Sequence, residues 1–263
     1  MEIGCCAPIE KYQAVSDAGF DFAELLGYLL SDYDFTLFKR FVQITNMVCL
    51  PVIRISSYCS GQPKIVGDGF DPKAIRTYAR GMAIKAEMLG VEYLGIGSPK
   101  ARILPEGYDA SLADEQCLEF LDITCAEARE CGVGVLLEAV HPGYCNYLND
   151  TAKAVELIER AGKDNLHLVL DLYNMKRNGE SWDDIKKYVP YIRHMHISTD
   201  LGGTSRGVYL PADEAELRET VRAIKASGYK GTVSMEPEPS RTDPEELRGA
   251  LKMMRRICAE ENI

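Results

Sequence analysis

The sequence contains no apolar run approaching the roughly 18–20 residues that a membrane span requires. Its N-terminus also lacks the basic and then apolar stretch of a secretory signal. Positive charge is scarce, because 30 Lys and Arg stand against 40 Asp and Glu, a formal net charge of −10. Nucleic-acid binding requires a basic face that neutralises phosphates. We therefore expect neither a nucleic-acid partner nor a membrane, and favour a small-molecule substrate.

Paired cysteine motifs are missing as well. The nine Cys, an odd number, are scattered without a C-x-x-C pair, and Cys5 and Cys6 are adjacent. Neither a zinc ribbon nor a secreted disulfide framework has this spacing. The expected state is a set of unpaired, mostly buried thiols, which favours a reducing, cytoplasmic setting.

Short apolar segments alternate with longer segments of helical spacing along the whole 263-residue chain. The sequence predicts eight strands, at Ile3–Cys6, Phe20–Leu25, Leu50–Ser56, Val91–Ile96, Val133–Leu137, Leu166–Leu170, Tyr191–Ile197 and Thr232–Met235. Helices are predicted between and after them, at Tyr12–Ala18, Phe35–Met47, Pro72–Leu89, Leu112–Cys131, Thr151–Ala161, Trp182–Tyr188, Ala212–Ala226 and Pro244–Ala259.

Strands that alternate with helices pair in parallel through right-handed crossovers. Eight such units in about 250 residues are the size of a (β/α)8 barrel. The competing arrangement, an open doubly wound sheet, usually has fewer strands and, when it binds nucleotides, a glycine fingerprint. Gly95-Ile-Gly97 is a lone Gly-x-Gly without a third glycine in register. We predict a (β/α)8 TIM barrel that forms a single domain over residues 1–263.

Acidic and imidazole side chains follow the apolar runs of the last four predicted strands. In a (β/α)8 barrel the working residues lie at these C-terminal strand ends, which here carry Glu138, Asp171, His196 and Glu236. Several carboxylates cannot all stay ionised in one small cavity without a cation, because each raises the pKa of the others. Oxygen-rich ligation with one imidazole suits Mn²⁺, Mg²⁺ or Co²⁺. We predict one divalent-metal site.

Each of these residues, taken singly, has an ordinary structural alternative. Asp171 or Glu138 could cap a helix or form a buried salt bridge, and His196 could be a hydrogen-bonded core histidine. The metal-site interpretation depends on all four falling at equivalent positions of consecutive units. His194 lies one layer deeper on the same strand face, where packing and hydrogen bonding are the predicted roles. His167 begins its strand and is expected at the opposite end of the barrel.

Several short motifs carry a resemblance to a known superfamily. They are Leu136-Leu-Glu-Ala-Val-His141, Leu168-Val-Leu-Asp-Leu-Tyr-Asn-Met175, His194-Met-His-Ile197, Arg206-Gly-Val-Tyr-Leu-Pro211, Val233-Ser-Met-Glu-Pro237 and the loop Gly97-Ser-Pro-Lys-Ala-Arg102 with Pro105-Glu-Gly107. In this order and spacing the chain resembles the xylose isomerase-like barrel superfamily over essentially its whole length. The similar branch is that of sugar phosphate isomerases/epimerases, which includes ketose 3-epimerases and hydroxypyruvate isomerases.

The resemblance implies that the four strand-end residues bind one divalent metal, most often manganese, with Mg²⁺, Co²⁺ or Zn²⁺ as alternatives. It also implies that Glu138 and Glu236 face opposite sides of a bound sugar. One carboxylate would remove the proton beside the carbonyl, and the other would return a proton to the resulting cis-enediolate. Arg206 matches a family arginine that contacts substrate oxygens.

Two positions depart from the family pattern. Members often have His three residues after the aspartate, where this chain has Asn174, and many epimerases have Asn where this chain has His141. An amide can donate a hydrogen bond but cannot carry a proton. We expect His141 and Asn174, with Arg206, to bind the substrate, while these departures leave the reaction itself open.

The first prediction for function is a metal-dependent isomerase or epimerase of a sugar, sugar phosphate or related hydroxyketone. The same enediolate could instead expel a β-hydroxyl, as in inosose- and dehydroshikimate-dehydratase-like members. A non-catalytic sugar-binding barrel is a third alternative. Glu138 and Glu236 argue against it, because a binding module has no need for a proton-transfer pair. A homo-oligomer is left open.

Overall fold

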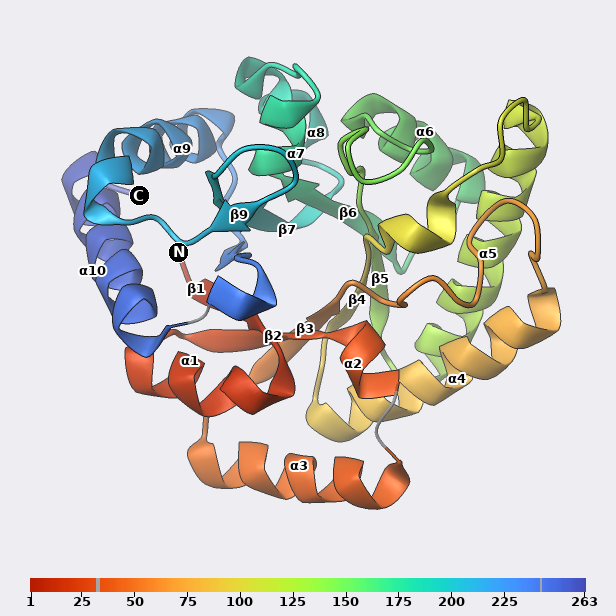
Figure 1. Cartoon of the computed structure of the whole chain (residues 1–263), viewed down its shortest axis with the longest axis horizontal. Coiled ribbons are helices and arrows are strands. Elements are labelled where there is room, and N and C mark those ends of the chain that lie inside the picture. The colour runs from red at the N-terminus through yellow and green to blue at the C-terminus, as the bar shows by residue number, and fades with distance from the viewer. Residues whose placement is uncertain (32–33, 242) are drawn as a thin grey trace.

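The structure is a computed structural model that describes residues 1–31, 34–241 and 243–263. Eight parallel strands close into a barrel in the order β1-β10-β7-β6-β5-β4-β3-β2, and helices surround it (Figure 1). The strands are β1 (Ile3–Ala7), β2 (Phe22–Leu26), β3 (Val52–Ser56), β4 (Tyr93–Ile96), β5 (Gly134–Leu137), β6 (Leu166–Asp171), β7 (Ile192–Ile197) and β10 (Thr232–Met235). The predicted (β/α)8 fold class is confirmed. The extent of the domain, 1–263, stays a prediction.

The longer helices lie close to their predicted positions. They are α1 (Tyr12–Ala18), α3 (Phe35–Val48), α4 (Pro72–Leu89), α5 (Ala110–Glu130), α6 (Thr151–Ala161), α9 (Glu214–Ser227) and α10 (Pro244–Glu261). Five of them begin at an aspartate whose side chain accepts backbone N–H groups of the first turn: Asp34, Asp71, Asp109, Asp150 and Asp243. Such caps satisfy donors that the helix itself leaves unpaired, which explains where these helices start.

Some short elements differ from the prediction. The predicted helix Trp182–Tyr188 is a 3-10 turn at Trp182–Asp184 followed by α8 (Ile185–Tyr188). Two short helices, α2 (Gly27–Ser31) and α7 (Leu172–Arg177), were not predicted and directly follow β2 and β6. Each is too short to show a clear helical period in the sequence.

Strand register brings the predicted site residues together. Asp171 on β6 is the register partner of His196 on β7, and His196 is in turn the partner of Ser234 on β10, two residues before Glu236. Backbone N–H of Glu138 donates to Ile96 O, which extends the β4–β5 pairing to the end of β5. The side chains at these strand ends therefore meet at one mouth of the barrel.

A small antiparallel ribbon stands over this mouth. It pairs β8 (Thr199–Asp200) with β9 (Arg206–Gly207). Arg177 on α7 donates to Gly203 O at 2.7 Å and pairs with Asp200 at 3.3 Å. The ribbon was not predicted, and it fixes the position of Arg206.

Among the described residues, no helix is both long and apolar enough to cross a membrane. All nine cysteines are unpaired, and seven of them are buried. The cytoplasmic setting and the oligomeric state stay predictions.

Candidate metal centre

The four residues predicted to bind metal converge. Glu138, Asp171, His196 and Glu236 are all buried, and each offers one ligand atom within 4.8 Å of the other three. Nδ1 of His196 lies 3.1 Å from Glu236 Oε2 and 3.6 Å from Glu138 Oε1. Three carboxylates and one imidazole thus share one small, buried volume.

Arg206 from β9 is part of the same cluster. Its Nη1 lies 2.9 Å from Asp171 Oδ2 and 2.8 Å from Glu236 Oε2. The other oxygen of Asp171, Oδ1, accepts the backbone N–H of Tyr173 at 2.8 Å and caps α7. Asp171 therefore has two structural roles. Its Oδ1 caps α7, and its Oδ2 lies in the strand-end cluster.

The pKa values in the cluster respond to burial and to these neighbours. Burial raises the pKa of Asp171 to about 7, an effect that Arg206 opposes and Glu236 and Glu138 reinforce. The pKa of Glu236 stays below its usual range, because Arg206 and His196 outweigh the effect of burial. Glu236 and Glu24 similarly raise the pKa of His196 well above its usual range despite its burial.

The cluster fits a divalent cation. His196 Nδ1 is buried and forms no hydrogen bond within the described structure, and its near neighbour Glu236 Oε2 is held by an ion pair with Arg206. A buried polar atom without a hydrogen bond is costly. An imidazole nitrogen and carboxylate oxygens are ligands that divalent metals accept, so a bound ion would satisfy His196 Nδ1 and share the negative charge of the carboxylates around it.

Asn174 on α7 lies between the carboxylates and His141. Its Nδ2 donates to Asp171 Oδ2 at 2.7 Å and to Glu138 Oε1 at 3.4 Å, and its Oδ1 accepts the backbone N–H of His141 at 3.2 Å. Both amide hydrogens therefore point at carboxylates of the cluster. In this arrangement Asn174 holds Asp171 and Glu138 in place.

His141 is buried against two tyrosine rings. Its ring centroid lies 4.4 Å from that of Tyr144 and 5.6 Å from that of Tyr173. Nδ1 accepts the backbone N–H of Gly143 at 3.0 Å. Burial, with Arg177 and Arg206, lowers the pKa of His141. The neutral ring therefore carries its proton on Nε2, which has no hydrogen-bond partner among the described residues.

A hollow of about 250 Å³ opens beside the cluster. Its walls include Tyr28, Ser57, Tyr144, Arg206, Glu236 and Pro237. A second hollow, of about 260 Å³, shares Tyr28 and Ser57 with it and extends to Ser98 and Lys100. Together they offer space for a small polar molecule at the mouth of the barrel, next to Glu236.

The two remaining histidines lie where the sequence placed them. His194 is fully buried on β7, one layer below His196, and is hydrogen-bonded on both ring nitrogens. His167, near the start of β6, lines a separate hollow with Glu92 and Asp164 at the N-terminal ends of the strands. Neither reaches the cluster.

Sequence reasoning missed two residues that contact the far side of His196. Glu24 Oε1 lies 3.0 Å from His196 Nε2, and Cys6 Sγ lies 4.0 Å from the same nitrogen. The available signal was Glu24, a carboxylate one residue before the end of the predicted strand Phe20–Leu25, where Asp21 lies near the start. A charge in a buried strand needs a partner, but its position within the strand rather than at the end kept it out of the predicted set.

Fold and site together define a class: (β/α)8 barrel proteins that gather carboxylates and an imidazole at the C-terminal ends of the strands. Within that class, the family model described as xylose isomerase-like TIM barrel matches residues 12–257, and the chain belongs to this family.

Relatives within reach of sequence comparison are sugar isomerases and epimerases. The chain is 26% identical over 230 residues to an inosose isomerase of Halalkalibacterium halodurans. This match covers 83% of this chain and 78% of the relative. This relative is named as an isomerase, and another that matches 42% of this chain is named as a D-psicose 3-epimerase.

Solved structures show the same fold. D-psicose 3-epimerase from Clostridium cellulolyticum, solved with D-tagatose, has a TM-score of 0.75 at 18% identity and covers 98% of this chain and 99% of its own. The IOLI protein, solved with a zinc atom, has a TM-score of 0.71 at 18% identity and covers 99% of both chains.

Proposed function

We propose that the protein is a divalent-metal-dependent isomerase or epimerase of a sugar or related hydroxyketone, acting through a cis-enediolate. The observation that carries the proposal is the convergence of Glu138, Asp171, His196 and Glu236 within 4.8 Å at the barrel mouth. The family and its isomerase and epimerase relatives support the reaction class.

In this proposal the same four residues hold the metal. The atom best placed for it is His196 Nδ1, which forms no hydrogen bond within the described structure and lies 3.1 Å from Glu236 Oε2 and 3.6 Å from Glu138 Oε1. The chemistry that a bound divalent ion supplies at such a site is Lewis-acid polarisation of a carbonyl. Manganese is the ion we favour, with Mg²⁺, Co²⁺ and Zn²⁺ as alternatives, since three oxygen ligands and one nitrogen suit all of them.

Glu138 and Glu236 carry the proton transfers. They approach His196 Nδ1 from β5 and β10, two strands that are not neighbours in the barrel. One carboxylate removes the proton from the carbon beside the carbonyl, and the other returns a proton. Return to that carbon from the opposite face gives an epimer, and return to the adjacent carbon gives an aldose–ketose isomer.

Arg206 and His141 provide the substrate contacts. The guanidinium of Arg206 already faces the hollow and carries more N–H donors than Asp171 and Glu236 use. The Nε2–H of His141 is a neutral, unpaired donor within the described structure. Asn174 acts mainly by holding Asp171 and Glu138, and its direct contact with substrate stays a prediction.

The test is a metal-loaded screen of inososes, ketoses and ketose phosphates in D₂O, followed by NMR. Inososes come first because an inosose isomerase matches 83% of this chain. We expect exchange of one C–H beside the carbonyl together with formation of an epimer or isomer of unchanged mass. Loss of water would establish the dehydratase alternative, and binding without exchange would establish the binding module.

Gly97, just after β4, provides a structural test of the metal site. A Cβ added there would lie 2.4 Å from Glu138 Oε2. Because that oxygen ends a flexible side chain, Gly97→Ala should displace the carboxylate rather than unfold the barrel. We expect metal affinity, measured by calorimetry, to fall at least about tenfold.

The matched control is Gly81→Ala in α4, where an added Cβ meets nothing within 4 Å. It should leave metal affinity unchanged and raise stability by about 0.5–1 kcal/mol, since alanine costs less than glycine in a helix. Wild-type metal affinity in Gly97→Ala would show that Glu138 is not a ligand in this position.

A further inference from the structure

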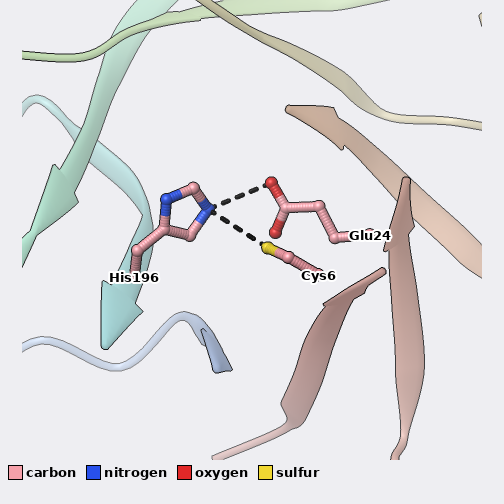
Figure 2. Close-up of side chains that lie close together, drawn as sticks. All are labelled: Cys6, Glu24 and His196. Atoms are coloured by element: carbon pink, nitrogen blue, oxygen red, sulfur yellow. Dashed lines mark hydrogen bonds and ion pairs between the residues drawn. The ribbon is translucent and has the colours of Figure 1, made fainter. Parts of the chain in front are cut away.

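Glu24 is a buried carboxylate of the barrel interior, only 1% exposed, that the proposed reaction does not use. It lies on β2, across the barrel from β7, and points at the ring of His196, as does Cys6 from β1 (Figure 2). Glu24 Oε1 is 3.0 Å from His196 Nε2. The opposite ring nitrogen, Nδ1, faces Glu138 and Glu236. The ring of His196 thus lies between Glu24 on one side and Glu138 and Glu236 on the other.

We propose that Glu24 is a positioning residue, which accepts the Nε2–H of His196 and so turns Nδ1 toward Glu138 and Glu236 as the nitrogen that binds the metal. The inference rests on the metal-dependent function proposed above. A neutral imidazole has one N–H, and the hydrogen bond made by one nitrogen decides which nitrogen binds metal. Ligating histidines usually donate their other N–H to such an acceptor, which orients the ring and makes it a stronger ligand.

The orientation of Glu24 is itself fixed by His194. Its second oxygen, Oε2, lies 3.0 Å from His194 Nε2. That nitrogen must carry the proton, because a ring lone pair facing a carboxylate oxygen at this distance would be repelled. Ser234 Oγ lies 2.9 Å from the same nitrogen and shares its N–H. Glu24 therefore accepts one N–H on each oxygen, from two rings on the same strand.

The proton of His194 is placed by a chain that begins on β3. Arg54 Nη2 donates to Thr232 Oγ1 at 2.7 Å, and Thr232 Oγ1 lies 2.8 Å from His194 Nδ1. Arginine can only donate, so the threonine oxygen accepts from it and its own hydrogen is available to Nδ1. This leaves Nε2 of His194 as the protonated nitrogen that faces Glu24. The buried chain thus fixes the tautomer of His194 and leaves the other oxygen of Glu24 to accept the Nε2–H of His196.

Glu24→Gln tests this role because it preserves shape and removes one acceptor. The glutamine amide presents one oxygen and one NH₂, so one of the two rings must face a donor instead of an acceptor. We expect the dissociation constant for Mn²⁺ or Co²⁺ to rise about 10- to 100-fold, as for other lost partners of ligating histidines. The ligand-field spectrum of the Co²⁺ protein should change with it.

The matched control is Glu127→Gln. Glu127 is also a buried carboxylate with two partners, Arg76 at 2.8 Å and Arg80 at 2.9 Å, but it lies on α5 outside the barrel. It should lower the melting temperature without changing metal affinity or the cobalt spectrum. A folded Glu24→Gln protein that binds metal as tightly as wild type would overturn the positioning role.

A measurement on the wild-type protein tests the positioning role of Glu24 even if Glu24→Gln does not fold. With isotope-labelled histidine and a spin-active cadmium isotope, NMR should show cadmium coupling to Nδ1 of His196 and a proton on Nε2. Coupling to Nε2, or a second cadmium bound by Cys6, Glu24 and His196, would overturn the inference while leaving a metal site. Wild-type protein that binds no divalent ion would overturn the proposed function as well.

Discussion

Glu138→Gln and Glu236→Gln are each expected to lower turnover by about 10²- to 10⁴-fold, the contribution of one general acid or base. The amide that replaces each carboxylate keeps its size but can neither accept nor deliver the transferred proton. Both residues are buried beside Arg206 or Asn174, and glutamine can still hydrogen-bond there. The barrel should therefore fold, with a melting temperature close to that of wild type.

The measurement is C–H exchange in D₂O and steady-state turnover on the best substrate, at saturating metal and with metal content determined for each variant. A variant that is inactive but still holds metal has lost the proton carrier, whereas a variant that no longer holds metal has lost a ligand. Glu127→Gln, a buried carboxylate far from the barrel mouth, should keep wild-type turnover. Wild-type activity in both active-site variants would refute the two-carboxylate mechanism.

Removal of the metal is the second large effect. We expect the purified protein to bind about one divalent ion per chain and to lose activity when a chelator removes it. Metal that binds only the folded state stabilises it by about 2.7 kcal/mol at a free concentration 100 times the dissociation constant. The melting temperature should therefore rise with added Mn²⁺. Full activity in a metal-free sample would rule out the site assignment.

Metal affinity should also depend on pH. The pKa of Asp171 is raised to about 7, first by burial and then by Glu236 and Glu138. A ligating carboxylate must be ionised, so protons compete with the metal below that pH. His196, whose pKa is also raised, acts in the same direction. We expect calorimetry to show weaker binding and more protons released per ion as the pH falls from 8 to 6. Affinity independent of pH would contradict these ligands.

The sequence was sufficient for the (β/α)8 fold and for the members of the candidate cluster. Buried parallel strands are continuous apolar runs, and all of them end at the same mouth of the barrel. A polar residue at the end of such a run, as at Asp171 or Glu236, is therefore placed by the pattern alone. The sequence also distinguished His194, one layer deeper, from His196.

Other features depended on contacts between distant parts of the chain. Only the structure shows that both amide hydrogens of Asn174 point at Asp171 and Glu138, while its predicted contact with substrate stays a prediction. The ribbon of β8 and β9 carries Arg206 to the cluster, and its two short strands have no periodicity that a sequence pattern could reveal. The sequence also does not show how much room surrounds a residue. Gly97 matters because the carboxylate of Glu138 lies against it in the folded barrel.

The sequence by itself determined which residues gather at the barrel mouth, because strand direction and the buried apolar runs decide that locally. Only the tertiary structure decided how His196 is turned. Its partner Glu24 is 172 positions away in the chain, and the two meet because β2 and β7 face each other across a closed barrel. Closure fixes distances across the interior, which no local pattern encodes, and those distances set which nitrogen of His196 faces Glu138 and Glu236.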